Sequence, residues 1–254
     1  MNTIACPRPT LNFQADDPSL TPHAGLALVG ETARILDVVA TIDRAVGGFK
    51  QRRRGLSAGE YLLALAESQL VGGDYFADLD TVRADHAGAV VRAVADPPAA
   101  RTALELGQRF AGAQMAALAP VQAALTRRLV AALPRARRRA LLRQRPTIDL
   151  DPTDVETYGP LKERMGWTHN GAWAGRPVLV TWAEAGTVLT GRLLAGNQDP
   201  RPTAPTLVRQ AIAALPSGCR RPRVRCDAGL FDGAVAWAAV DAGADFAIAA
   251  ARNA

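Results

Sequence analysis

Residues 147–153, TIDLDPT, and residues 223–229, RVRCDAG, carry most of the structural information in this chain. Each segment places an acidic side chain on a short apolar run between turn-forming residues, the pattern of a strand that ends in a carboxylate. Because side chains alternate along a strand, Asp149, Asp151 and Thr153 share one face while Ile148 and Leu150 take the other. Two acids therefore project together from the first strand.

Around these two segments the sequence predicts an α/β core. Alternating or β-rich runs predict three consecutive antiparallel strands, and apolar helical faces then separate two further strands. The expected elements are strand, strand, strand, helix, strand, helix, strand, at residues 147–157, 177–183, 187–194, 203–215, 223–226, 233–242 and 246–250. In this order the first and fourth strands lie side by side. The prediction is a partial RNase H-like mixed sheet with crossover helices.

The residues before 147 predict helices. Apolar residues recur at helical spacing from Pro22 to Val46, and Ser57 with Glu60 forms a capping box that opens a second helix, to about Val71. Further helical runs are predicted at 75–84, 99–117 and 120–133. The fold class is therefore α+β or α/β, and the chain divides into an extended lead-in (1–20), a helical, basic region (21–146) and the core (147–254).

The positive charge lies in the helical region. Residues 1–146 contain 19 Lys and Arg against 13 Asp and Glu, whereas residues 147–254 contain 11 of each. Arginine supplies most of it, and guanidinium groups suit phosphate oxygens, so an acidic polymer such as DNA is the indicated partner. The alternatives are codon usage that favours arginine and a solvated helix face. The candidate backbone contacts are Arg52, Arg53, Arg54, Arg137, Arg138 and Arg139.

The cysteines and the apolar runs indicate a cytoplasmic protein. Cys6, Cys219 and Cys226 lack paired spacing, and the chain has no N-terminal basic and apolar leader, which favours reduced thiols. Charges or prolines interrupt every apolar stretch before the roughly 18 residues needed to span a bilayer. We therefore expect no membrane role.

Asp151 and Asp227 are the candidate metal ligands. If the strand that ends at Asp227 lies beside the first strand, the two carboxylates come close, and adjacent carboxylates repel unless a cation lies between them. Oxygen ligands without His or Cys nearby favour Mg²⁺ or Mn²⁺ over zinc. The alternative is that Asp149 and Asp227 are strand-end caps or solvent-facing residues.

Several blocks of this sequence resemble the DDE transposases of bacterial insertion sequences. They are residues 148–159, IDLDPTDVETYG; 191–197, GRLLAGN; and 224–231, VRCDAGLF; residues 55–74 resemble the N-terminal region of that family. The resemblance implies an RNase H-like core that binds terminal inverted repeats and cuts and rejoins DNA with Mg²⁺ held by two Asp and one Glu. It identifies Asp151, in its Asp-x-Thr context, as the first catalytic and metal-binding acid and Asp227 as the second. Asp149 is the alternative for the first role.

The third acid is the point of departure from the family. The family's Glu lies on a helix after the last core strand, whereas the acids that follow Asp227 here are Asp232, Asp241 and Asp245, which helix capping or a turn explains better. We therefore expect a C-terminally truncated transposase that cleaves poorly. The alternative is a non-catalytic DNA-binding remnant, or a competitor of the full-length enzyme. The expected partners are terminal-repeat and target DNA in the nucleoid, with a homodimer when active.

Overall fold

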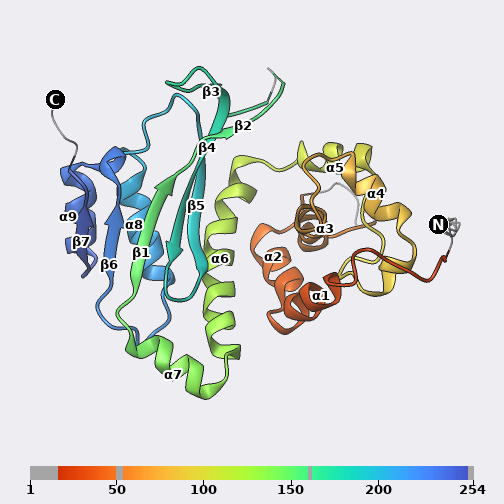
Figure 1. The fold of residues 1–254 in the computed structure, drawn as a ribbon, viewed down its shortest axis with the longest axis horizontal. Helices are drawn as coiled ribbons and strands as arrows, with labels where there is room; N and C mark the ends of the chain where they lie inside the picture. Colours follow the sequence, from red (N-terminus) through yellow and green to blue (C-terminus); the bar gives the residue numbers. More distant parts are fainter. Residues whose placement is uncertain (1–16, 50–53, 160–161, 251–254) are drawn as a thin grey trace, which may run out of the picture.

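The computed structural model describes residues 17–49, 54–159 and 162–250, which form a helical region followed by a mixed α/β region (Figure 1). Most of the lead-in predicted for residues 1–20 lies outside the described residues, as do Arg52 and Arg53. Within the described part of the chain, none of the helices combines the length and the apolar character needed to cross a membrane.

The helical region contains more breaks than the sequence predicts. Its elements are α1 (Leu26–Ile35), α2 (Val38–Val46), α3 (Ala58–Leu70), α4 (Asp78–Ala84), η1 (Ala87–Val90), α5 (Ala100–Gly107), α6 (Gly112–Ala132) and α7 (Arg135–Arg143). The single helix expected from Pro22 to Val46 is wrong, because Asp37 adopts a left-handed conformation (φ 53°) between α1 and α2. The helix break expected before Pro120 is also wrong, because this exposed proline lies inside α6.

The capping box that opens α3 is confirmed. The Ser57 hydroxyl accepts a hydrogen bond from the Glu60 N–H (3.2 Å), and the Glu60 carboxylate accepts one from the Ser57 N–H (2.7 Å). Two N–H groups that have no partner inside the helix are thereby satisfied.

We expect Ser57→Ala to lower the free energy of unfolding by about 1 kcal/mol, the usual cost of losing a helix N-cap. The matched control is Ser217→Ala, which changes an exposed serine at the turn after α8 (Ala204–Ala214) and should alter stability by less than about 0.5 kcal/mol. Urea denaturation followed by circular dichroism measures both. Equal effects from the two variants would contradict a stabilising role for the cap.

The α/β region has the strand order of the RNase H-like fold, as predicted. Its strands are β1 (Thr147–Pro152), β2 (Val155–Glu156), β3 (Gly166–Trp167), β4 (Trp173–Trp182), β5 (Thr187–Ala195), β6 (Arg223–Cys226) and β7 (Asp245–Ile248), with α8, η2 (Ala228–Leu230) and α9 (Gly233–Asp241) between the later ones. β5, β4 and β1 pair antiparallel, whereas β1, β6 and β7 pair parallel. The main order is therefore β5-β4-β1-β6-β7.

One face of this sheet is covered and the other is open. Ile148 and Leu150 of β1 are buried with Val224 and Cys226 of β6, in a core to which α8 and α9 contribute. Figure 1 shows both helices against the same side of the sheet. On the opposite face, Leu179, Gly191 and Leu193 of β4 and β5 are exposed.

Helix α6 belongs to both parts of the molecule. Val121 packs in the core of the helical region, whereas Val130, further along the same helix, packs in the core under the sheet. The Gln122 side chain also donates to the Val188 carbonyl of β5 (2.7 Å). The helix therefore lies between the two parts (Figure 1) and joins them through buried contacts.

Candidate carboxylate site and nucleic-acid interface

Asp151 and Asp227 lie side by side at the ends of two neighbouring parallel strands. Leu150 of β1 pairs with Cys226 of β6, so the two acids are the next residues along each strand. Asp227 keeps an extended backbone (φ −75°, ψ −179°), which continues the alternation of β6. Both acids are exposed. Because neighbouring strands lie about 4.8 Å apart, this register brings the backbones of the two acids close together.

The carboxylate pair lies on the open face of the sheet. Across the antiparallel ladder Asp151 pairs with Leu179 of β4, which in turn pairs with Gly191 of β5. Leu179 is 44% exposed and Gly191 is also exposed, so the surface beside the acids is not covered by the helices. The two carboxylates therefore face solvent.

The turn after Asp227 leaves space for its carboxylate. Leu230 of η2 is fully buried and fixes the turn to the core. A Cβ added to Gly229 would lie 3.3 Å from Oδ1 of Asp227 and 3.5 Å from Oδ2. The glycine in the Asp-Ala-Gly segment therefore lets the carboxylate lie against the turn.

Asp149 is held by an arginine that sequence reasoning missed. Asp149 pairs with Arg225 across the parallel ladder, and Arg225 donates to both oxygens of its carboxylate (Nε to Oδ1 2.7 Å, Nη2 to Oδ2 2.7 Å). This hydrogen bonding raises the pKa of Arg225. Because both oxygens of Asp149 are engaged, Asp151 is the better placed first acid. Among the described residues, the Asp151 carboxylate has one weak side-chain partner, the Thr153 hydroxyl, which donates to it at 3.4 Å.

Cys226 precedes Asp227 but projects to the other side of the sheet, where it is buried. Burial raises the pKa of its thiol to about 12, with smaller contributions from Asp227 and Asp149. Cys226 therefore lies on the opposite side of the sheet from the carboxylate pair.

A third acidic ligand is not found among the described residues, where no three His, Cys, Asp or Glu side chains form a group suited to a metal. The Asp232 carboxylate caps α9 by accepting from the Ala234 N–H (2.7 Å), and Asp245 pairs with Arg221 (2.8 Å). Asp241 is exposed at the end of α9. Two carboxylates open to water still fit Mg²⁺ or Mn²⁺, because Mg²⁺ keeps several waters and needs only one or two carboxylates.

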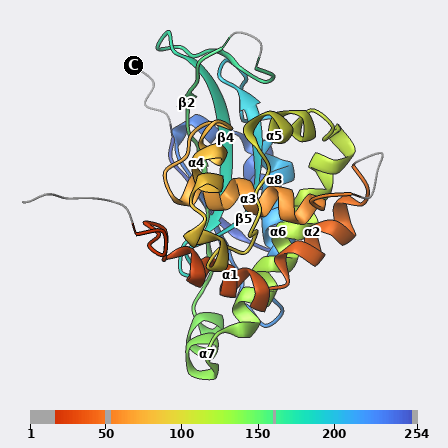
Figure 2. The same ribbon diagram turned by 90° about the vertical axis from the view of Figure 1, so that its right-hand side faces the viewer.

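The arginines singled out in the sequence lie away from the carboxylates. Arg137 and Arg139 are exposed and Arg138 is partly exposed on α7, which leads into the start of β1, whereas Asp151 lies near its end. Figure 2 shows α7 at the far end of the molecule from β2. Arg54 is exposed before α3. Arg176, near the first acid, is instead built into the fold by a bidentate pair with Asp154.

Comparisons with protein-family models, with curated proteins and with solved structures found no match for this chain.

The Arg225 guanidinium places a positive charge beside the carboxylate pair, so its removal is expected to strengthen metal binding. Arg225→Gln also releases Asp149 on the face that carries Asp151. We expect Mn²⁺ to bind roughly fifteenfold more tightly, the effect of removing one charge about 5 Å from a divalent ion in water-like surroundings. Isothermal titration with Mn²⁺ measures this change.

The matched control for this prediction is Arg209→Gln, which removes an exposed arginine from α8 on the covered side of the sheet. The control should leave the affinity for Mn²⁺ unchanged. Weaker binding by Arg225→Gln would show that the arginine supports the metal site instead of opposing it.

Proposed function

We propose that this protein carries out metal-dependent cleavage and strand transfer of DNA, as a transposase of the DDE type from a bacterial insertion sequence. The observation that carries the proposal is the placement of Asp151 and Asp227 on the open face at the ends of adjacent parallel strands. The strand order of the RNase H-like fold and the resemblance of residues 148–159 and 224–231 to that family support it.

In this proposal each part of the site has a separate task. Asp151 and Asp227 hold the metal, and Arg225 keeps Asp149 engaged outside it. The open strands β4 and β5 leave room for a duplex beside the acids. Bound Mg²⁺ or Mn²⁺ supplies the activation of a water or a 3′-hydroxyl and the stabilisation of the leaving oxygen.

The partners follow from the same proposal. They are duplex DNA with terminal inverted repeats and a target duplex, bound through arginines of the helical region such as Arg137, Arg138 and Arg139. Joining two DNA ends requires two copies of the protein when it is active. Its location is then the cytoplasm, in association with the nucleoid.

A second candidate function is DNA binding without cleavage. It is favoured by the pair of carboxylates that, within the described residues, is not completed by a third acid. Such a protein would occupy the ends of the element and compete with an active transposase.

Incubation of the purified chain with a supercoiled plasmid that carries terminal repeats separates the two candidates. If the protein is an active enzyme, we expect nicked and linear products that form only with Mg²⁺ or Mn²⁺ and are absent when a chelator is added. Salt-sensitive binding without any nicking would reject the enzyme and support the binding protein. Cleavage that persists in the chelator would reject the metal-dependent mechanism.

A further inference from the structure

Arginines from two distant parts of the chain meet at the end of the sheet where β1 and β6 begin. Helix α7 leads into β1, and the segment 220–223 leads into β6; because these strands pair in parallel, Thr147 beside Arg223, both segments lie at the same end. We name this surface the basic pole. It consists of Arg135, Arg137, Arg138, Arg139, Arg143, Arg145, Arg220, Arg221 and Arg223.

Few acids offset this charge. Asp245 pairs with Arg145 and Arg221, and the Glu184 carboxylate accepts from the Thr147 N–H (2.8 Å). Asp241 lies at the end of α9. Within the described part of the chain, the arginines of the basic pole without an ion-pair partner are Arg135, Arg137, Arg138, Arg139, Arg143, Arg220 and Arg223. Like charges at this density repel one another, and phosphate groups relieve the repulsion.

The basic pole and the carboxylate pair are separate sites, but β1 and β6 run from the first to the second. Thr147 and Asp151 are four residues apart in β1, a distance of about 13 Å. Along β6, Arg223 and Arg225 precede Asp227 on the same face and are both exposed. Arg225 is paired with Asp149, so among these residues Arg223 carries the unpaired positive charge that extends from the basic pole onto the open face.

We propose that the basic pole is a second binding site for the phosphate backbone of duplex DNA. One duplex runs from the basic pole along the open face to the carboxylate pair, over about four base pairs at 3.4 Å each. The part of this inference that joins the two sites rests on the proposed function. The proposed function already assigns Arg137, Arg138 and Arg139 to DNA, and this inference adds Arg220, Arg221 and Arg223 to the same surface.

The test measures binding of a fluorescent duplex to the full-length protein over a range of KCl concentrations without divalent metal. Arg137→Gln/Arg220→Gln removes two charges of the basic pole, and Arg109→Gln/Arg209→Gln removes two exposed charges elsewhere. If both arginines contact phosphates, the pole variant lowers the slope of log affinity against log salt by about 1.8. The control variant keeps the slope of the wild type, and circular dichroism establishes that both variants are folded.

The outcomes distinguish this inference from the proposed function. A pole variant with the slope of the control overturns the inference even if the wild type cleaves DNA. Displacement of the duplex by polyglutamate at equal charge concentration also overturns it, because the site then takes any polyanion. Binding that depends on the basic pole in a protein that never cleaves supports the second DNA site and rejects the catalytic proposal.

Discussion

Replacement of Asp151 by Asn is expected to slow metal-dependent DNA cleavage by about a thousandfold or more. Asp151 is exposed on the open face, and it belongs with Asp227 to the pair at the ends of β1 and β6. Metal ions stabilise the transition state of phosphate attack by several kcal/mol, and each 1.36 kcal/mol is a factor of ten in rate. The substitution keeps the shape of the side chain, so affinity for DNA without metal should change by less than about twofold.

The control for Asp151 is its neighbour on the same strand face. Asp149→Asn removes a carboxylate that Arg225 already engages through both oxygens, so cleavage should fall by less than about tenfold. Plasmid nicking rates for the two variants measure the difference. The reverse order, with Asp149→Asn inactive and Asp151→Asn active, would make Asp149 the first metal ligand.

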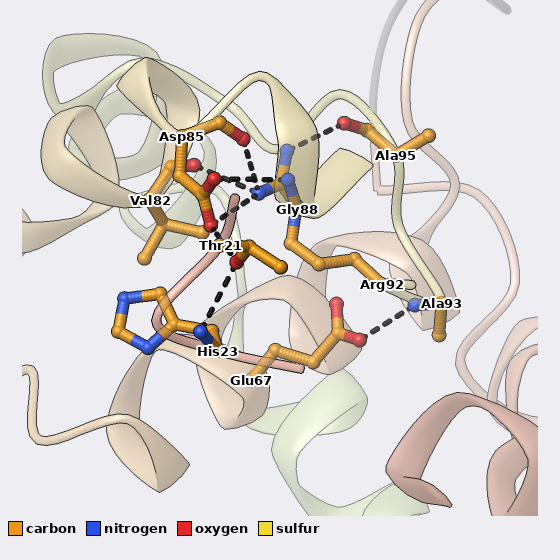
Figure 3. A network of polar contacts seen from close by, with 9 residues as sticks. All are labelled: Thr21, His23, Glu67, Val82, Asp85, Gly88, Arg92, Ala93 and Ala95. Atoms are coloured by element: carbon orange, nitrogen blue, oxygen red, sulfur yellow. Dashed lines mark hydrogen bonds and ion pairs between the residues drawn. The ribbon is translucent and has the colours of Figure 1, made fainter. Parts of the chain in front are cut away.

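Replacement of Arg92 by Met is expected to lower the free energy of unfolding by about 3–5 kcal/mol. The side chain of Arg92 is 2% exposed, at the centre of the network in Figure 3. Its guanidinium donates to the carbonyls of Val82 (2.9 Å), Asp85 (3.0 Å) and Ala95 (3.0 Å). Methionine fills much of the volume but leaves these buried carbonyls without a donor.

The same network explains why the effect should be large. The Asp85 carboxylate accepts from the Thr21 hydroxyl (2.6 Å) and the Gly88 N–H (2.9 Å), and the buried Glu67 carboxylate accepts from the Ala93 N–H (2.6 Å). Burial raises the pKa of Glu67. The Arg92 guanidinium therefore helps to attach the segment between α4 and α5 to the rest of the helical region (Figure 3). Loss of the guanidinium weakens that attachment.

The control for Arg92 is Arg83→Met in the same region. Arg83 is 42% exposed and pairs with Asp96 at 3.8 Å, so its loss should cost less than about 0.5 kcal/mol. Urea denaturation measures both variants. A loss below about 1 kcal/mol for Arg92→Met would show that the network adds little to stability.

The sheet could be predicted from the sequence because its signals are local. Strand alternation, the turn at Gly186 (φ 62°) and the Asp232 cap of α9 each depend on a few neighbouring residues. The break at Asp37 has no such signal, because the helical spacing of apolar residues continues across it. It is stabilised from a distant helix, where Arg128 of α6 donates to the Leu36 carbonyl (2.8 Å).

The position of Pro120 shows the limit of a local rule. Proline usually ends a helix because it lacks an N–H donor and crowds the preceding turn. Here α6 continues from Gly112 to Ala132, since its two ends pack in different cores, through Val121 and Val130. Long-range packing outweighs the local cost.

The candidate site was only partly predictable for the same reason. The sequence places Asp151 and Asp227 at strand ends, but the choice between Asp149 and Asp151 depends on the strand register. Only the pairing of Asp149 with Arg225 shows which acid is already engaged. Likewise, the arginines of α7 are visible as a run, whereas their proximity to Arg220 and Arg221 requires the parallel pairing of β1 and β6.

The most direct test of the central claim is the binding of Mn²⁺ to the protein, followed by electron paramagnetic resonance of the free ion. The wild type is expected to bind Mn²⁺, and Asp151→Asn and Asp227→Asn should each weaken binding by at least about tenfold, because each removes a direct ligand. Asp149→Asn should not weaken it comparably. Equal binding by the wild type and by the Asp151 and Asp227 variants would contradict a metal site at these two carboxylates.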